Sequence, residues 1–151
     1  TKDEVAHYVD LMPDGTHRQY TSIQEAKSVI TAPSGGQKLL NQGYYDITGL
    51  AWSGRGTVQK VEVSVDGGRN WRPARLVGPV LPKALTRFHW DWVWQGEEAL
   101  LQSRVTDSSG YIQPSRAQLV EIRGTRSIYH NNAIQTWRVG VDGEVHNVQL
   151  G

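Results

Sequence analysis

The sequence predicts an all-β fold, an antiparallel β-sandwich, and three observations lead to this prediction. Several short runs alternate apolar and polar residues with a period of two, which is typical of half-buried strands. Clusters of Gly, Pro, Asp and Ser separate these runs at regular intervals, as in a sandwich of short strands. The 151 residues include 16 Gly, six Trp and six Tyr but one Phe and one Met. Trp and Tyr have an apolar body and a polar tip, which suits half-buried sheet faces.

The N-terminal part is the least regular. Residues 1–26 contain the turn signal Met12-Pro13-Asp14-Gly15, and we interpret them as a linker or arm that lies over another surface. The run at 26–32 (AKSVITA) is the first expected strand. It ends at the turn signal PSGG, residues 33–36.

The next two strands and a hairpin follow from alternation. Residues 44–52 are rich in strand formers, and in 58–65 the valines at alternate positions share one face. Asp66-Gly67-Gly68 predicts a tight hairpin turn, because Asp-Gly tolerates the positive φ angles that such a turn requires. Residues 71–76 are then expected to form the return strand.

Residues 86–94 have the strongest strand pattern of the sequence. In a strand, the rings of Phe88, Trp90, Trp92 and Trp94 fall on one face. A helix would scatter these four rings around its circumference. The turn at 96–98 leads into another expected strand at 99–106. A run at 117–122 is expected to be the last strand of the sandwich.

The tail contains a run at 137–141, a turn at Asp142-Gly143 and a run at 145–150. We therefore divide the chain into a linker or arm at 1–26, a sandwich domain at 27–124 and a C-terminal arm or hairpin of the same domain at 125–151.

Composition limits the classes of function. The 16 Lys and Arg nearly balance the 15 Asp and Glu, so no basic field argues for nucleic acid. No apolar run approaches the ~18 residues of a membrane helix, and the first residues do not resemble a signal peptide. The chain has no cysteine, which excludes disulfides, thiolate ligands and a cysteine nucleophile.

No complete catalytic site is expected within this chain. The common nucleophile and phosphate-loop motifs are missing. The five histidines do not have the spacing of metal ligands on one strand or helix, so no metal site is expected. They are His7, His17, His89, His130 and His146.

The tryptophans have three interpretations. The stripe of Trp90, Trp92 and Trp94 could form the sandwich core, or it could anchor a subunit interface together with Trp137. It could also be a platform for carbohydrate, which requires exposed rings. Exposure is not readable from the sequence, so all three interpretations stay open.

Arg123, at the end of the last expected strand, has two interpretations. It could be an ordinary surface arginine before the turn at Gly124. Alternatively, its planar guanidinium could bind an oxyanion by paired hydrogen bonds.

The sequence AWSG at 51–54 is followed by VEVS at 61–64 and DGGRNW at 66–71. These segments, in this order, resemble the C-terminal domain of the sulfite oxidase family of molybdenum enzymes. The run ALLQSRVTDSSGYIQP at 99–114 resembles the family's strand, D-x-x-G loop and Q-P ending. Arg123-Gly124 matches the family's arginine-glycine pair.

Three further segments resemble one branch in particular, the sulfane dehydrogenase molybdenum subunit of the bacterial thiosulfate-oxidising (Sox) system. These segments are EAKSVIT at 25–31, VLPKALTRF at 80–88 and YHNNAIQTW at 129–137.

The resemblance implies an immunoglobulin-like sandwich with N- and C-terminal extensions that mediates homodimerisation. It implies that a molybdopterin-molybdenum cofactor is bound by a preceding domain and not by this chain. It further implies oxidation of sulfite or of a carrier-bound sulfane, a c-type cytochrome subunit as partner and a periplasmic location. No nucleic acid and no membrane are expected as partners.

The resemblance also implies two substrate-binding residues. Arg123 matches the family's arginine near the anionic substrate. A second family arginine follows the AWSG turn, but Thr57 occupies that position here and Arg55 lies two residues earlier. Arg55 is therefore the weaker candidate.

The first functional hypothesis is thus the dimerisation domain of such an enzyme, inactive as this chain alone. An independent carbohydrate- or protein-binding module is the alternative. A structural subunit without a link to catalysis is a third possibility.

Overall fold

A computed structural model describes residues 9–11, 17–19, 26–54, 56–81, 84–118 and 132–148, the first two of these ranges by their backbone alone. The strands of this part of the chain are β1 (Val9–Leu11), β2 (His17–Gln19), β3 (Lys27–Ala32), β4 (Gly43–Trp52), β5 (Val58–Ser64), β6 (Arg72–Pro73), β7 (Arg75–Val77), β8 (Thr86–Trp94), β9 (Ala99–Asp107), β10 (Thr136–Val139) and β11 (Val145–Val148).

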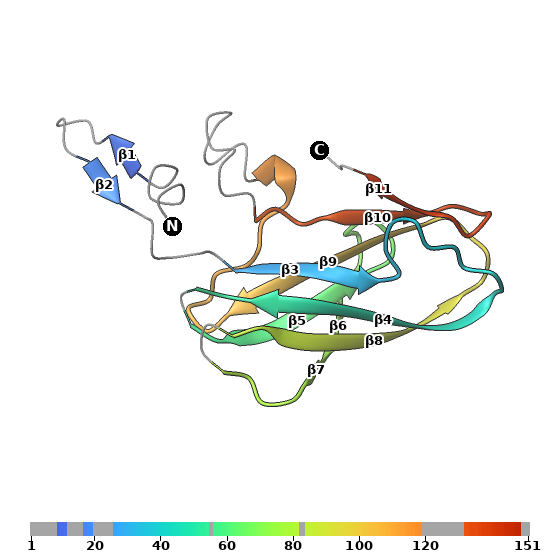
Figure 1. The fold of residues 1–151 in the computed structure, drawn as a ribbon, viewed down its shortest axis with the longest axis horizontal. Helices are drawn as coiled ribbons and strands as arrows, with labels where there is room; N and C mark the ends of the chain where they lie inside the picture. Colours follow the sequence, from blue (N-terminus) through green and yellow to red (C-terminus); the bar gives the residue numbers. More distant parts are fainter. Residues whose placement is uncertain are drawn as a thin grey trace.

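Two antiparallel sheets pack face to face (Figure 1). The four-stranded sheet has the order β3-β4-β8-β7, and the five-stranded sheet has the order β11-β10-β9-β5-β6. β1 and β2 pair with each other in a separate ribbon beside the sandwich. The prediction of an all-β antiparallel sandwich is confirmed, and the strand expected at 86–94 has those bounds.

The core lies between the sheets because alternate side chains of each strand point inward. Ile47 on β4 and Phe88 on β8 face Val61 on β5 and Leu101 on β9, and all four are fully buried. Removing this apolar surface from water is the main stabilising contribution to the fold, at about 25 cal/mol per Å².

The prediction of a single return strand at 71–76 is wrong, because two short strands, β6 and β7, occupy this segment. β6 pairs with β5, and β7 pairs with β8 of the opposite sheet. The chain passes between the sheets at Ala74, whose N–H donates to the carbonyl oxygen of Val61 at 2.8 Å. The alternation of apolar and polar residues breaks at this crossing, where Pro73 and Ala74 are adjacent.

The prediction of a strand at 117–122 is also wrong for residues 117 and 118, the part of it that the structure describes. Residues 116–118 form a short helical turn, and 119–122 lie outside the described residues. The amide oxygen of Gln118 accepts from the N–H of Ser115, and the Ser115 hydroxyl oxygen accepts from the N–H of Gln118. This reciprocal pair has the geometry of a helix capping box.

β10 and β11 form the hairpin expected in the tail, and β10 pairs with β9 at the edge of the five-stranded sheet. The hairpin therefore extends one sheet of the sandwich. No helix in the part of the chain that the structure describes is long and apolar enough to span a bilayer.

Candidate functional site at one end of the sandwich

The loops that carry the family-like motifs meet at one end of the sandwich. β4 ends at Trp52, which pairs with Lys27 at the start of β3. β9 ends at Asp107, which pairs with Val58 at the start of β5. The loop after β4, the loop after β9 and the start of β3 therefore lie together, and we call this region the motif end.

Asp107 is the hydrogen-bonding centre of the motif end. Its carboxylate is fully buried and accepts from the Ser53 hydroxyl at 2.8 Å through Oδ2. Its Oδ1 accepts from the Ser109 hydroxyl at 2.6 Å and from the N–H groups of Ser109 and Tyr111. The carboxylate thus ties the AWSG turn to the D-x-x-G loop.

Burial alone would raise the pKa of the Asp107 carboxyl, because a low dielectric disfavours the charged form. The hydrogen bonds from Ser109, Ser53 and Tyr111 together outweigh burial and lower the pKa. Asp107 is therefore ionised at neutral pH. In this form its carboxylate only accepts hydrogen bonds, which suits the donors around it.

A second contact joins the same two loops. The N–H of Ser108 donates to the carbonyl oxygen of Thr57 at 2.9 Å, and the N–H of Thr57 donates to Ser108 Oγ at 3.1 Å. A Cβ at Gly56 would lie 2.3 Å from Ser108 Oγ. Glycine at this position therefore permits the two loops to approach.

A chain of polar contacts continues from these loops to the base of the segment that contains Arg123. The amide nitrogen of Asn132 donates to the Tyr111 hydroxyl oxygen at 2.9 Å and to the carbonyl oxygen of Ala26 at 3.0 Å. The N–H of Ile134 donates to the carbonyl oxygen of Pro114 at 2.9 Å. The chain thus leaves the sandwich after Pro114 and returns by Asn132 at nearly the same place.

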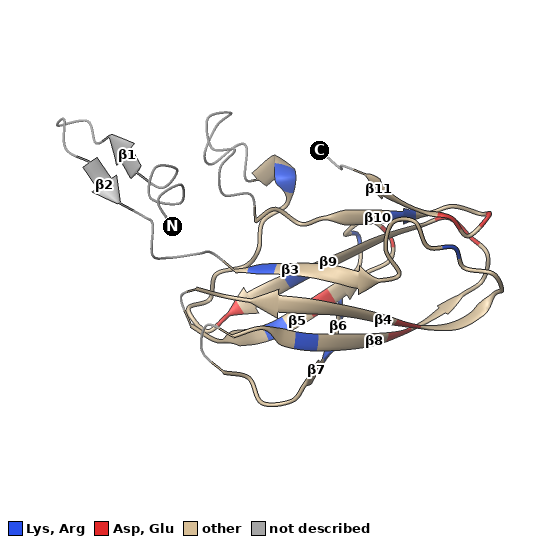
Figure 2. Ribbon diagram, viewed as in Figure 1, with Lys and Arg blue, Asp and Glu red and all other residues tan. Residues whose placement is uncertain are grey.

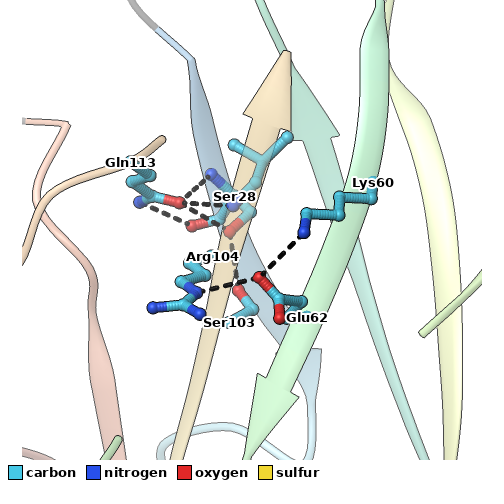
Figure 3. A network of polar contacts seen from close by, with 7 residues as sticks. Ser28, Lys60, Glu62, Ser103, Arg104 and Gln113 are labelled. Carbon is cyan, nitrogen blue, oxygen red and sulfur yellow. Dashed lines mark hydrogen bonds and ion pairs between the residues drawn. The ribbon is translucent and has the colours of Figure 1, made fainter. Parts of the chain in front are cut away.

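Side chains also close the free edge of β3. Gln113 Oε1 accepts from the Ser28 N–H at 3.0 Å and from the Ser28 hydroxyl at 2.7 Å, and Ser28 Oγ lies 2.8 Å from Ser103 Oγ (Figure 3). Gln113 Nε2 donates to the carbonyl oxygen of Ser28, and Trp137 Nε1 donates to that of Ile30 at 3.0 Å. These side chains satisfy backbone groups that an edge strand would otherwise present to another strand.

The neighbouring charges of the five-stranded sheet pair with each other on its outer face. Arg104 Nε donates to Glu62 Oε1 at 3.0 Å, and Lys60 Nζ lies 3.9 Å from the same oxygen (Figure 3). The Arg104 guanidinium also lies 4.3 Å from the centre of the Trp71 ring, a cation–π contact.

The two predicted substrate-binding residues, Arg123 and Arg55, lie outside the described residues. The structure describes residues on either side of each segment. Gly54 and Gly56 flank Arg55, and Pro114 and Asn132 lie before and after the segment that contains Arg123. The contacts through Asp107 and Tyr111 join these flanks, so both arginine-bearing segments start from the motif end.

The tryptophan stripe points into the sandwich. Trp92 and Trp94 are each 4% exposed, Trp90 packs against the core, and Trp94 Nε1 donates to the carbonyl oxygen of Glu97. Trp137 also packs against the core. Stacking on sugar requires exposed rings, which Trp92 and Trp94 do not offer, and contact of Trp90 or Trp137 with a partner stays a prediction.

Sequence reasoning missed the residues that organise the motif end. Asp107, Gln113 and Asn132 all fall in segments that resemble the family, but polar side chains in such segments are ordinary loop residues until their partners are known. One partner of each lies far away along the chain: Ser53 is 54 positions from Asp107, Ser28 is 85 from Gln113 and Ala26 is 106 from Asn132.

A sequence model of the Mo-co oxidoreductase dimerisation domain matches residues 18–137. The chain is 36% identical to sulfite oxidase of Gallus gallus over 123 residues, covering 74% of this chain and 26% of that protein. It is 36% identical to mitochondrial sulfite oxidase of Mus musculus over 119 residues, covering 70% and 21% respectively.

Among solved structures, the sulfane dehydrogenase SoxCD from Paracoccus pantotrophus matches with a TM-score of 0.89 and 53% identity. That match covers all of this chain and 39% of the SoxCD chain. The chain therefore corresponds to about a quarter of the chicken enzyme and to well under half of the SoxCD chain. With the two-sheet sandwich and the motif segments in the same order, these matches show that the chain belongs to the Mo-co oxidoreductase dimerisation domain family.

Proposed function

We propose that this chain is the dimerisation part of a sulfite-oxidase-type molybdenum oxidoreductase that oxidises a sulfur substrate, a carrier-bound sulfane or sulfite. The observation that carries the proposal is the match to SoxCD over the whole chain at 53% identity. The motif end adds a physical reason, because it anchors two arginine-bearing segments where a companion domain could use them.

The metal chemistry belongs to a molybdopterin cofactor, which supplies two-electron oxidation when bound. The described residues do not fit a ligand set for its metal: the sequence has no cysteine, and no three His, Asp or Glu residues of the described part gather at one point. We therefore assign the cofactor to another domain of the enzyme. This chain contributes dimerisation and cationic side chains.

Arg123 is the proposed substrate-binding residue, and Arg55 is a weaker second candidate. A guanidinium binds an oxyanion through two parallel hydrogen bonds, which fixes both position and orientation. The contacts of Asp107 and Asn132 support this role, because they hold described residues on either side of both segments at the motif end.

The test is Arg123→Ala in the assembled enzyme that contains this chain. We expect KM to rise by about 10-fold or more, because a lost charged hydrogen bond costs about 1.5–3 kcal/mol. Arg116→Ala is the control, since Arg116 is an exposed arginine at the base of the same segment, and KM should not change. An unchanged KM for Arg123→Ala would remove the arginine from the proposal and favour a purely structural subunit.

The chain alone should not oxidise sulfite or a sulfane, because its proposed role requires the cofactor domain. Turnover by the isolated chain would contradict the proposal. We further propose a homodimer, a c-type cytochrome as electron-accepting subunit and a periplasmic location.

A further inference from the structure

The end of β7 and the connection from it to β8 expose three apolar side chains at the edge of the four-stranded sheet (Figure 1). Val77, Leu81 and Leu85 are 40%, 54% and 63% exposed, and we call these three residues the β7–β8 patch. Exposed apolar residues scattered singly over a surface are ordinary, whereas a group of them in one place marks an interaction site. The patch is therefore a candidate contact with another protein.

Neighbouring residues hold the patch against the sandwich. Leu76 and Val80, each directly before an exposed residue of the patch, pack against the core. Thr86, directly after the last residue of the patch, is buried and begins β8. Pro79 restricts the backbone further, because its ring fixes φ. The three exposed side chains thus project from a restrained backbone, so ordering them on a partner costs little conformational entropy.

The patch lies beside the motif end. Thr86 pairs with Ala51, the first residue of the AWSG segment. Neighbouring strands of a sheet are about 4.8 Å apart, so Leu85, next to Thr86, lies close to the AWSG segment that leads to Arg55. The proposed function places the substrate, and with it the metal of the cofactor domain, at the motif end. A partner bound to the patch would therefore stand near the metal.

Cations flank the patch. Arg87 lies opposite Val77 in the strand register, and Arg75 precedes Val77 by two positions on β7. Both arginines are exposed, and among the described residues neither forms an ion pair. Residues 75–90 contain no Asp or Glu, and Figure 2 shows blue but no red beside this connection on β7 and the start of β8. A fitting partner therefore offers an apolar surface with acidic groups at its rim.

We propose that the β7–β8 patch is the surface on which the electron-accepting c-type cytochrome subunit docks. This rests on the proposed function, which supplies the subunit, and it adds the face that the subunit binds. A subunit that stays bound requires an apolar interface core with charges at the rim, which the patch and its two arginines offer. Each two-electron oxidation of the sulfur substrate then reduces two ferric haem irons to ferrous, one electron at a time.

Distance favours this patch over the other exposed apolar side chains. Leu40 and Val141 are 79% and 74% exposed, but they lie between β3 and β4 and between β10 and β11, at the opposite end of the sandwich. The ten residues of β4 separate the two ends by about 30 Å. Electron transfer slows steeply with distance, so an acceptor at that end would be too far from the metal. Leu40 and Val141 therefore serve as matched controls.

The test uses the assembled enzyme, with its cofactor domain and its own c-type cytochrome subunit. The double variant Leu81→Glu with Leu85→Glu places two carboxylates in the apolar contact and near the acidic rim of the partner. The dissociation constant for the cytochrome subunit should rise at least about 10-fold, and haem reduction by the substrate should fall with it. Turnover with ferricyanide, a small oxidant that needs no docking surface, should equal that of the wild type.

Leu40→Glu with Val141→Glu is the matched control, since it makes the same charge change at two more exposed apolar positions. It should leave cytochrome binding, haem reduction and ferricyanide turnover unchanged. Circular dichroism of each variant checks the sandwich.

An unchanged dissociation constant for the patch variant would overturn the assigned surface. Loss of ferricyanide turnover together with loss of molybdenum would assign the patch to the cofactor domain, and a halved mass of the enzyme would assign it to the dimer; either result overturns the proposal. A wild-type enzyme that turns over with ferricyanide but binds no cytochrome would also overturn it. A wild-type enzyme that turns over with neither acceptor would instead contradict the proposed function.

Discussion

At the scale of single residues, buried acceptors organise the loops. Asp107 accepts hydrogen bonds from two side chains and two backbone groups of the loops that follow β4 and β9. Hydrogen bonds to a charged acceptor are about twice as strong as neutral ones. We therefore expect the placement of the two segments that contain Arg55 and Arg123 to depend on this buried carboxylate.

Asp107→Ala should lower the free energy of unfolding by about 3 kcal/mol, because several buried donors lose their acceptor at once. Urea denaturation followed by tryptophan fluorescence measures this change. Asp142→Ala is the control, since Asp142 is exposed and its carboxylate accepts a hydrogen bond from the Glu144 N–H, and its cost should be about 1 kcal/mol or less. A loss for Asp107→Ala no larger than for the control would contradict the central role of Asp107.

Asp66 gives a pH-dependent prediction. Hydrogen bonds from Asn70 and Ser64 lower its pKa from 3.8 to about 2. Because the folded-state pKa lies below the unfolded value, the stabilisation is present above about pH 4 and is lost as the pH falls through 2. Asp66→Asn should therefore be less stable than wild type at pH 5, and the difference should shrink toward pH 2. Urea denaturation at both values tests this, and a constant difference would contradict it.

At the scale of elements, the edge of β3 depends on side chains that replace a neighbouring strand. Gln113, Asn132 and Trp137 contact successive backbone groups at Ala26, Ser28 and Ile30. A bare edge strand can pair with other chains, so this closure protects the sheet from association at that edge.

Gln113→Ala should speed the hydrogen exchange of the Ser28 amide by about 10-fold or more, since a lost hydrogen bond to a buried group costs about 1–3 kcal/mol. Amide exchange measured by NMR tests this. Gln95→Ala changes an exposed glutamine at the end of β8 and should leave the Ser28 amide unaffected. Equal exchange in Gln113→Ala and wild type would mean that another group protects this edge.

Gly49 on β4 leaves no room for a side chain. A Cβ at Gly49 would lie 2.2 Å from the Phe88 ring and 2.3 Å from the Val29 carbonyl oxygen. Gly49→Ala should therefore cost about 3 kcal/mol, the upper end of typical overpacking. Gly36→Ala, where φ is +84° and nothing lies within 4 Å, isolates backbone strain and should cost about 1–2 kcal/mol. Thermal unfolding compares the two, and an equal or smaller loss at position 49 would contradict the steric account.

Local patterns predicted most strands of the sandwich, because alternation within one segment reports which face is buried. The pattern failed at 71–76 and at 117–118, where the outcome depends on a contact with another part of the chain: the bond from Ala74 to Val61, and the capping pair of Ser115 and Gln118. The arginines of the candidate site came from family resemblance. Asp107 and Asn132 could not be predicted, since their roles arise only when distant loops meet.

At the scale of the whole molecule, the sandwich separates two tasks. One end gathers the described residues on either side of the segments that contain Arg55 and Arg123, and the proposed function gives the domain a second task, dimerisation. The packed core between the two sheets holds this end in a fixed relation to the rest of the sandwich. An enzyme with this domain could thus hold two active sites in a constant arrangement.

The most direct measurement of the central claim is the mass of the chain in solution, by sedimentation equilibrium over a range of concentrations. The account predicts a reversible dimer with twice the 16.9 kDa mass of one chain. A single species with the mass of one chain at every concentration would contradict it.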